Sequence, residues 1–301
     1  MSFFSKKKII VVHSGNFHAD DAFAVAALRL FLGDKKKIKV IRTRDKEIID
    51  RADYVADVGG VYDPAKRRFD HHQIGGAGKR ENGIPYASFG LVWKEYGETI
   101  CGSKEVAERV DRTLVQPIDA MDNGVSIYDC KIDGLFPYTI QSIISLFRPN
   151  WKNEDHNNNT QAFLTFALFA KDILEREIVV NTIMVLGNEK VLEAYNNSKD
   201  KRVIVLDKNY PWQEILCGKL EPLYVVYPSS EDKTWHVDAV PKKPFTFELR
   251  KMLPASWAGK RDEELVSLTG IKDAVFCHNA RFLIVTKTKE SAIVLAERAC
   301  Q

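Results

Sequence analysis

The 301-residue sequence predicts an α/β fold with two domains, and three observations support this prediction. Short apolar, β-branched runs alternate with alanine- and leucine-rich stretches at the start of the chain, which is typical of a mostly parallel sheet with crossover helices. A helical segment follows between residues 86 and 178, and a second alternation of strands and helices begins near residue 199. We therefore expect a larger domain over residues 1–198 and a smaller α/β domain over residues 199–301.

The first domain is expected to open with a strand, a helix and two further strands. Residues 7–15 form a short β-branched run that ends in Ser-Gly, the pattern of a buried strand. Residues 19–33 predict a helix, because alanine and leucine are good helix formers and glycine suits the end of a helix. Residues 37–44 and 54–60 predict the next two strands. In a parallel sheet of this kind, ligands bind beyond the carboxyl ends of the strands.

Two long helices are expected in the middle of the chain. Residues 103–124 predict a helix that is interrupted at Pro117, because proline removes a backbone donor and clashes with the preceding turn. Asp119 and Asp122 follow this proline. Residues 159–186 predict a second helix, with apolar residues on most of its faces.

The smaller domain is expected to combine four strands with two helices. Its apolar runs predict strands, and its charged, leucine-containing stretches predict helices. The predicted strands are residues 201–208, 222–230, 234–241 and 274–288, and the predicted helices are residues 261–270 and 289–299.

Composition narrows the class of protein. Hydrophobic residues make up 45% and charged residues 28%, as in soluble globular proteins, and a net charge of +3 permits a phosphate-bearing partner. The five cysteines are scattered and never spaced as CxxC, which argues against a disulfide framework or a zinc cluster and fits a reducing compartment. No run approaches the roughly 18 apolar residues of a membrane span, and no targeting segment is evident. We expect an intracellular protein with no membrane partner; the cytoplasm, nucleus and mitochondrion all remain open, and so does a homodimer.

The histidines are concentrated beside carboxylates. The stretch RRFDHHQ, residues 67–73, places an aspartate directly before two adjacent histidines, although the whole chain has only 7 histidines. Adjacent side chains diverge on a strand and on a helix, so the two histidines are expected to have different roles. Four acidic or histidine-bearing segments fall in the first half of the chain, and their residues are His13, His18, Asp20, Asp21, Asp57, Asp70, His71, His72, Asp119 and Asp122.

These residue types favour a site for two divalent metal ions. Mn²⁺ and Mg²⁺ prefer carboxylate oxygens, and Mn²⁺ also accepts imidazole. Two ions about 3.5–4 Å apart need a bridging carboxylate, and Asp57, at a strand end, is the expected bridge. The remaining ligand set is His13, His18, Asp20, one of His71 and His72, and one of Asp119 and Asp122.

Capping is the alternative explanation for the carboxylates. An aspartate at a strand end is commonly a cap or turn residue, and Asp20 and Asp21 could cap the helix that follows them. Capping does not explain why histidines gather at strand ends beside these carboxylates, so the metal site is favoured.

With these segments assembled, the chain resembles the DHH phosphoesterase superfamily, named for the Asp-His-His run seen here at residues 70–72. The usual first motif of that superfamily is His-x3-Asp-x-Asp, and here it reads His13-x4-His18-x-Asp20. This departure from the usual motif points to a narrower group. The chain resembles the Myg-one (melanocyte proliferating gene) family at the stretches HSGNFHADDA, ADVGGVYDPAKRRFDHHQ and IDAMDNG. The resemblance continues at WHVDAVP, LPASWAGKRDEEL and FCHNARF, and so covers nearly the whole chain.

The resemblance implies a metal-dependent hydrolase with a DHH-type N-terminal domain, most closely a 3′–5′ RNA exonuclease with two ions, Mn²⁺ favoured and Mg²⁺ possible. It implies that RNA or a short oligonucleotide is the substrate, and that His72 faces the phosphate and acts in catalysis together with the bridging Asp57. The implied metal ligands are His13, His18, Asp20, Asp57, His71 and either Asp119 or Asp122. A small-molecule phosphatase or pyrophosphatase shares these motifs, and a non-catalytic nucleic-acid-binding relative is a third reading.

In the smaller domain, His236, Arg261 and His278 lie in the segments that carry the resemblance, and substrate binding across an interdomain cleft is expected of them. Arginine suits this role because its guanidinium pairs with phosphate in a bidentate way. A local role, in which Arg261 pairs with Asp262 or Glu264, is the alternative. Relatives usually carry a glycine pair and a histidine where this chain has residues 284–287, Ile-Val-Thr-Lys. We therefore expect this chain to bind its substrate differently from those relatives.

Overall fold

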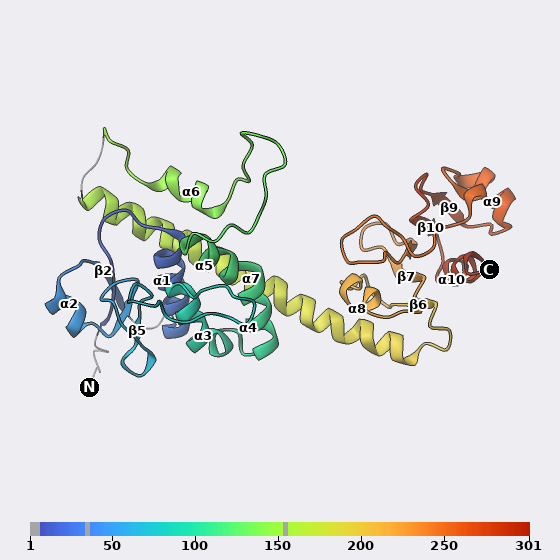
Figure 1. Cartoon of the computed structure of the whole chain (residues 1–301). Coiled ribbons are helices and arrows are strands. Elements are labelled where there is room, and N and C mark those ends of the chain that lie inside the picture. Colours follow the sequence, from blue (N-terminus) through green and yellow to red (C-terminus); the bar gives the residue numbers. More distant parts are fainter. Residues whose placement is uncertain (1–6, 34–36, 153–155) are drawn as a thin grey trace. The chain divides into compact units, whose positions relative to one another are not determined.

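The computed structural model describes residues 7–33, 37–152 and 156–301. The chain divides into two compact units, Met1–Thr182 and Ile183–Gln301, and each unit contains a five-stranded sheet (Figure 1). The fold is therefore mixed α/β, as the sequence predicts. The division falls inside helix α7, His156–Asn197, whereas the sequence analysis places the domain boundary just beyond the end of this helix.

The sheet of the first unit is mostly parallel, as expected. Its strands lie in the order β2-β1-β3-β5-β4. The first four of these pair in parallel, and β4 joins the edge in the antiparallel direction. The strand bounds are β1 Lys8–Val12, β2 Ile38–Arg42, β3 Tyr54–Ala56, β4 Tyr62–Asp63 and β5 Arg68–Phe69.

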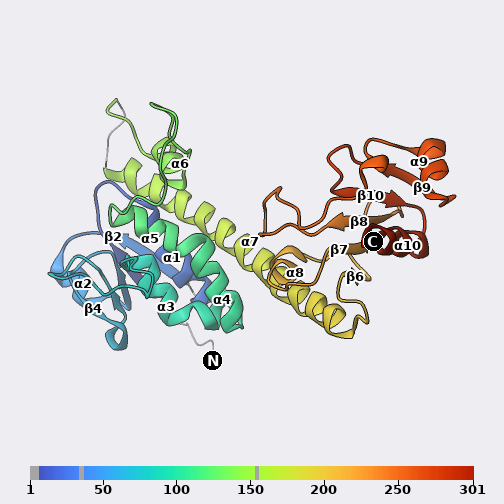
Figure 2. The same ribbon diagram turned by 45° about the vertical axis from the view of Figure 1, so that its right-hand side comes forward.

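Three helices pack close to this sheet (Figure 2). Helix α1, Ala19–Leu32, is buried along almost its whole length because alanines allow close packing against α3, Ser88–Cys101. The short helix α2, Lys46–Arg51, was not predicted; its Ile49 packs with Val11 and other sheet residues. Because β1, β3 and β5 are paired in parallel, their carboxyl ends meet at one edge of the sheet.

The helical segment that follows is more continuous than the sequence predicts. Helix α4, Lys104–Val110, passes through a single π-helical turn, Asp111–Val115, directly into α5, Gln116–Asp122. Pro117 lies in the first turn of α5, where a missing backbone donor costs little. The helix was expected to be interrupted at Pro117, whereas its irregularity is the π turn just before this residue. A long loop then leads to α6, Ile140–Phe147, and to α7.

The second unit has a mixed sheet in the order β6-β7-β8-β10-β9. Only β6 and β7 pair in parallel. Residues 274–288, predicted as one strand, form a hairpin instead, since Arg281 adopts the left-handed φ of 58° and its N–H donates to the carbonyl of His278. The strand bounds are β6 Val203–Val205, β7 Tyr224–Pro228, β8 Trp235–Ala239, β9 Ala274–Cys277 and β10 Leu283–Thr286.

Helices cover one face of this second sheet and part of the other. Helix α10, Lys289–Ala299, packs on one face, and α9, Asp262–Thr269, contributes Leu265 to the same core. On the opposite face, the short helix α8, Gln213–Cys217, and the last turns of α7 pack against β6 and β7. Among the described residues, no helix is long and apolar enough to cross a membrane.

Candidate metal centre

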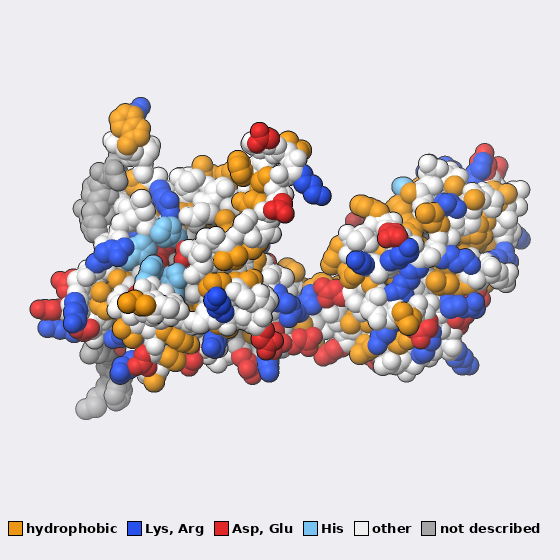
Figure 3. Space-filling model, in the orientation of Figure 1, with side chains coloured by type: hydrophobic (Ala, Val, Ile, Leu, Met, Phe, Trp, Pro, Cys, Tyr) orange, Lys and Arg blue, Asp and Glu red, His pale blue; other side chains and the backbone are white. Residues whose placement is uncertain are grey.

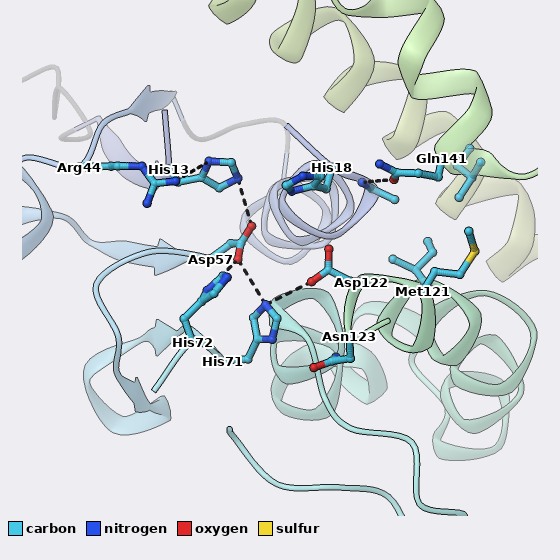
Figure 4. A pocket seen from close by; sticks show the side chains of 13 residues that line it. His13, His18, Arg44, Asp57, His71, His72, Met121, Asp122, Asn123 and Gln141 are labelled. Atoms are coloured by element: carbon cyan, nitrogen blue, oxygen red, sulfur yellow. Dashed lines mark hydrogen bonds and ion pairs between the residues drawn. The ribbon is translucent and has the colours of Figure 1, made fainter. Parts of the chain in front are cut away.

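Histidines and carboxylates gather in one pocket of the first unit, at the edge of the sheet where β1, β3 and β5 end. The pocket has a volume of about 490 Å³. The pale-blue histidine atoms mark it as a hollow in Figure 3, and Figure 4 shows its side chains. The lining residues are His13, His18, Ala19, Arg44, Asp57, His71, His72, Ile118, Met121, Asp122, Asn123, Ile140 and Gln141.

Three strands end directly before residues of the site. His13 follows β1, Asp57 follows β3, and Asp70 and His71 follow β5. Asp57 adopts φ 56°, a left-handed conformation that costs a non-glycine residue about 1–2 kcal/mol. Strain of this kind persists where the surrounding structure requires it, and it turns the Asp57 carboxylate into the pocket.

Asp57 lies between separate histidines. Its Oδ2 is 3.3 Å from Nε2 of His13. Its Oδ1 is 3.5 Å from Nε2 of His71 and 3.4 Å from Nδ1 of His72. The two oxygens of one carboxylate thus face two different groups of nitrogen atoms (Figure 4), which is the arrangement that a bridging ligand has.

Several buried polar atoms here have no hydrogen-bond partner among the residues that the structure describes: Nε2 of His13, Nε2 of His71, Oδ1 of Asp57 and Oδ2 of Asp21. They lie 3.1–3.5 Å from atoms of their neighbours, but without hydrogen-bond geometry. Nδ1 of His13 is 3.0 Å from the carbonyl of Ser14, which can only accept; with its proton on Nδ1, the ring would offer the lone pair of Nε2 to a metal ion. Leaving a buried polar atom unpaired costs about 1–3 kcal/mol, and a bound cation would remove that cost.

The structure brings seven of the predicted site residues together. Three groups have ligand atoms that all lie within 4.8 Å of one another. These groups are His13 with His18 and Asp57; Asp57 with His71 and His72; and Asp20 with His71 and Asp122.

The two adjacent histidines differ in their surroundings. The side chain of His71 is 8% exposed, and its Nε2 lies 3.2 Å from Oδ2 of Asp122. The side chain of His72 is 61% exposed, and its Nδ1 lies 2.7 Å from Oδ1 of Asp70. His71 therefore faces the buried carboxylates, while His72 is held by Asp70 at the mouth of the pocket.

Asp119 is placed differently from the other candidates and belongs to none of the three groups. It is fully buried, and its Oδ2 accepts from Nη1 of Arg80 at 2.7 Å while its Oδ1 accepts from the N–H of Gly90 at 3.0 Å. Asp122, three residues later in α5, is the one that faces His71. Sequence reasoning could not separate these two aspartates, because both follow the same proline.

The two aspartates at the start of α1 cap different helices. Asp21 accepts from the N–H of His18 at 2.9 Å, and so caps its own helix. Asp20 accepts from the N–H groups of Ser88 and Phe89, at 3.0 and 2.6 Å, and so caps α3. Asp21 was not among the predicted ligands, although its Oδ2 is 3.1 Å from Nε2 of His13. Its position next to Asp20 was the only signal in the sequence.

Opposite charges shift the pKa values in the pocket. Burial lowers the pKa of His13, but Asp21 and Asp57 outweigh it and raise the value to about 10. Burial likewise lowers the pKa of His71, and Asp122 and Asp57 raise it to about 11. Burial raises the pKa of Asp57, yet His13 and His71 hold it below its usual range. The cluster thus stabilises positive charge at its centre, supplied by protons or by a metal ion.

In the second unit, the three predicted substrate-binding residues gather on one face of the sheet. His236 pairs across the strands with Val285 of β10, which in turn pairs with Phe276 of β9, so these side chains share a face. The Arg261 guanidinium lies 5.1 Å from the ring of Phe276. The ring of His278 lies 6.1 Å from the same ring.

Glu264, one of the two local partners considered for Arg261, pairs with Lys260 at 3.0 Å. Of the residues at the position of the missing glycine pair, Ile284 belongs to the core under α10, and Val285 is on the face of His236. Asp238, which sequence reasoning missed, shares this face; Tyr227 donates to it at 2.9 Å, and its Oδ1 is buried without a partner. Burial raises the pKa of Asp238 to about 6.

Comparison with known proteins identifies the family. The family model MYG1_exonuc, described as "Uncharacterised protein family (UPF0160)", matches residues 9–300. The chain belongs to the MYG1 family. The MYG1 protein of Schizosaccharomyces pombe is 31% identical over 320 residues, which cover 96% of both chains. The MYG1 protein of Saccharomyces cerevisiae is 32% identical over 324 residues, covering 96% of this chain and 95% of its own.

A human MYG1-family relative carries a functional name. The protein named MYG1 exonuclease in Homo sapiens is 28% identical over 317 residues, which cover 95% of this chain and 84% of the human one. Membership in the MYG1 family confirms the narrower resemblance inferred from the sequence motifs.

Proposed function

We propose that this MYG1-family protein is a metal-dependent exonuclease of the DHH phosphoesterase type, acting on RNA or short oligonucleotides in the 3′–5′ direction. One observation carries the proposal: the two oxygens of Asp57 face His13 on one side and His71 and His72 on the other. A carboxylate placed in this way is suited to bridge two ions. The name of the human relative, MYG1 exonuclease, supports the choice of reaction.

The donor set fits the ions that the proposal requires. Imidazole nitrogens and carboxylate oxygens together suit Mn²⁺ better than Mg²⁺, which takes oxygen ligands almost alone. His13, His18 and Asp57 would hold one ion, and Asp57, His71, Asp20 and Asp122 the other. Asp20 can still serve as a ligand, because each oxygen that accepts a backbone N–H keeps a second lone pair. Two bound ions would lower the pKa of a shared water and stabilise charge on the phosphoryl group.

The protein's own residues orient the substrate. Asp70 fixes Nδ1 of His72, so that Nε2 of this exposed ring is directed away from Asp70 and towards solvent. Nε2 would contact a phosphoryl oxygen there, which would place the scissile bond at the mouth of the pocket. Arg44 lines the same pocket and adds a second positive group for the phosphate.

The second unit would bind the rest of the substrate chain. Arg261 offers a guanidinium for a phosphate, and the rings of Phe276 and His278 beside it suit stacking with a base. His236 is on the same face of the sheet. Residues 242–301 contain 11 Lys and Arg against 7 Asp and Glu, a balance that suits an anionic partner.

A direct assay tests the proposal. Purified protein with Mn²⁺ is incubated in parallel with 5′-labelled RNA, 3′-labelled RNA, DNA, short oligonucleotides and pyrophosphate, and Asp57→Asn serves as the inactive control. We expect 3′-labelled RNA to release labelled mononucleotides at once, while 5′-labelled RNA shortens stepwise. Turnover of pyrophosphate alone would favour a small-molecule phosphatase. Binding of RNA without turnover at any Mn²⁺ concentration would favour a non-catalytic relative and refute the proposal.

A further inference from the structure

A buried ion-pair network lies behind the proposed metal site and has no role in the mechanism given above. Its centre is Arg80, in the loop between β5 and α3, whose side chain is only 7% exposed. Its Nε and Nη2 donate to the two oxygens of Asp111 at 3.1 and 2.7 Å. Its Nη1 donates to Oδ2 of Asp119 at 2.7 Å. One guanidinium thus joins the start of the π turn to the middle of α5.

The packing around this network is tight where it meets α3. A Cβ added to Gly90 would lie 1.8 Å from Oδ2 of Asp119 and 2.9 Å from Nη2 of Arg80. The ring of Tyr86 lies 4.3 Å from the guanidinium carbon of Arg80. Nε2 of Gln116 donates to Asp111 at 2.7 Å. The network is therefore a built feature of the fold, since a glycine is required where it meets α3.

The network is coupled to the proposed metal ligands through two helices. The first N–H groups of α3 are divided between two carboxylates: those of Ser88 and Phe89 go to Asp20, and that of Gly90 goes to Asp119. In α5, Asp122 follows Asp119 by three residues, which places the two on the same side of the helix. Fixing Asp119 therefore fixes the helix that presents Asp122 to His71.

Charge gives Arg80 a second task. Asp119 adds a buried carboxylate beside the cluster of Asp20, Asp57 and Asp122. Without a nearby cation, this extra negative charge would remain unpaired in the protein interior, and buried charges are tolerated only when they are paired. Arg80 is the paired cation, and Asp111 holds it in place from the other side.

We propose that Arg80 is a positioning residue of the metal centre: held in place by Asp111, it pairs with Asp119, and it holds α5 so that Asp122 meets His71. In this arrangement Asp119 is an anchor and Asp122 is the ligand. This role of Arg80 rests on the proposed metal site. Arg80 and Asp119 would position Asp122 without contacting a metal ion or the substrate themselves.

Mn²⁺ affinity, measured by calorimetry or by the electron paramagnetic resonance signal of free Mn²⁺, tests this without an activity assay. Removing a group that orients a metal ligand typically weakens metal binding about 10–100-fold. We expect that loss for Arg80→Met. The loss for Arg80→Lys should be smaller, because lysine keeps the positive charge, but it should still be measurable, because an ammonium cannot contact Asp111 and Asp119 in a fork. Arg112→Met is the matched control, since Arg112 is an exposed neighbour of Asp111, and its affinity should equal that of the wild type.

Three aspartate variants separate an anchor from a ligand. Asp119→Asn should cost little affinity, whereas Asp122→Asn should cost at least about 100-fold, as for a lost ligand. The double variant Arg80→Met/Asp119→Asn should bind Mn²⁺ better than Arg80→Met alone, because it removes the unpaired buried charge. Excess Mn²⁺ should restore the nuclease activity of Arg80→Met, which damage to the fold alone would not allow.

Circular dichroism and thermal melting establish that each variant is folded. Should Arg80→Met fail to fold, Arg80→Lys and Asp119→Asn carry the test, since both keep a polar group in place. Equal Mn²⁺ affinity of Arg80→Met or Arg80→Lys and the wild type would overturn the inference. So would a loss in Asp119→Asn as large as that in Asp122→Asn. A wild-type protein that binds no Mn²⁺ at all would refute the proposed function itself, and the inference with it.

Discussion

His71 and His72 provide the sharpest test of the site, because two adjacent residues of the same type are expected to fail in different ways. Nε2 of His71 is buried and lies 3.2 Å from Asp122 and 3.5 Å from Asp57. His72 is held by Asp70 and leaves most of its ring exposed. We predict that His71→Ala loses metal and that His72→Ala loses turnover while it keeps metal.

The structure sets the size of each effect. Replacing His71 removes one nitrogen ligand and leaves the buried oxygens of Asp57 and Asp122 facing a gap, so Mn²⁺ should bind at least about 100-fold more weakly, or about 2.7 kcal/mol. Replacing His72 removes a donor to the phosphoryl group, which typically lowers kcat by about 10²–10³. The Mn²⁺ dissociation constant of His72→Ala should stay within about twofold of the wild-type value.

Metal content after dialysis, the Mn²⁺ dissociation constant and kcat are measured side by side for the wild type and both variants. Asn and Gln replacements of each histidine serve as controls for the volume that alanine removes. Equal loss of Mn²⁺ from both variants would show that the two roles are wrongly assigned. Loss of turnover without loss of metal in His71→Ala would show that His71 is not a ligand.

The remaining predictions concern other parts of the molecule. Arg261→Ala should raise KM for a long RNA and leave hydrolysis of a minimal phosphodiester unchanged, since remote binding energy is lost while the metal chemistry stays; an equal effect on both substrates would contradict this. Burial raises the pKa of Asp238 from its ordinary 3.8 to about 6 in the folded state, so its contribution to stability is complete below pH 3.8 and is lost as the pH rises through about 6. Asp238→Asn should therefore raise the melting temperature at pH 8 more than at pH 4, and an equal shift at both would refute the burial argument. Removal of metal with EDTA should lower the free energy of unfolding by about 2.7 kcal/mol relative to protein at 100 times its Mn²⁺ dissociation constant, and an unchanged melting curve would argue against a resident ion.

The sequence was sufficient to gather most of the site because its information is local. His13 and Asp57 each follow a strand that the sequence predicts, and parallel strands bring their carboxyl ends to one edge of a sheet. The two-residue strand β5, which precedes Asp70 and His71, was not predicted. The helix predicted over residues 19–33 indicated that the first two strands run in parallel.

Other features depend on contacts that no local pattern reveals. Arg80 meets Asp119 across 39 residues, and only the packed positions of a loop and a helix bring the two together. The hairpin within residues 274–288 was missed because its turn contains no glycine or proline, and Arg281 takes the left-handed conformation instead. Helix α2 was missed because six residues are too few for a clear apolar period.

Asp20 shows that a carboxylate which caps a helix can also lie among candidate metal ligands. A carboxylate that caps a helix is held by backbone N–H groups, here those of Ser88 and Phe89, and needs no side-chain rearrangement to keep its orientation. A metal ligand also requires a fixed carboxylate with free lone pairs, and the same two hydrogen bonds supply the fixed position. Because α3 begins at these N–H groups, the helix that closes the core also aims Asp20 at His71 and Asp122. The capping contact is therefore compatible with the proposed metal site, because it would preorganise Asp20 as a ligand.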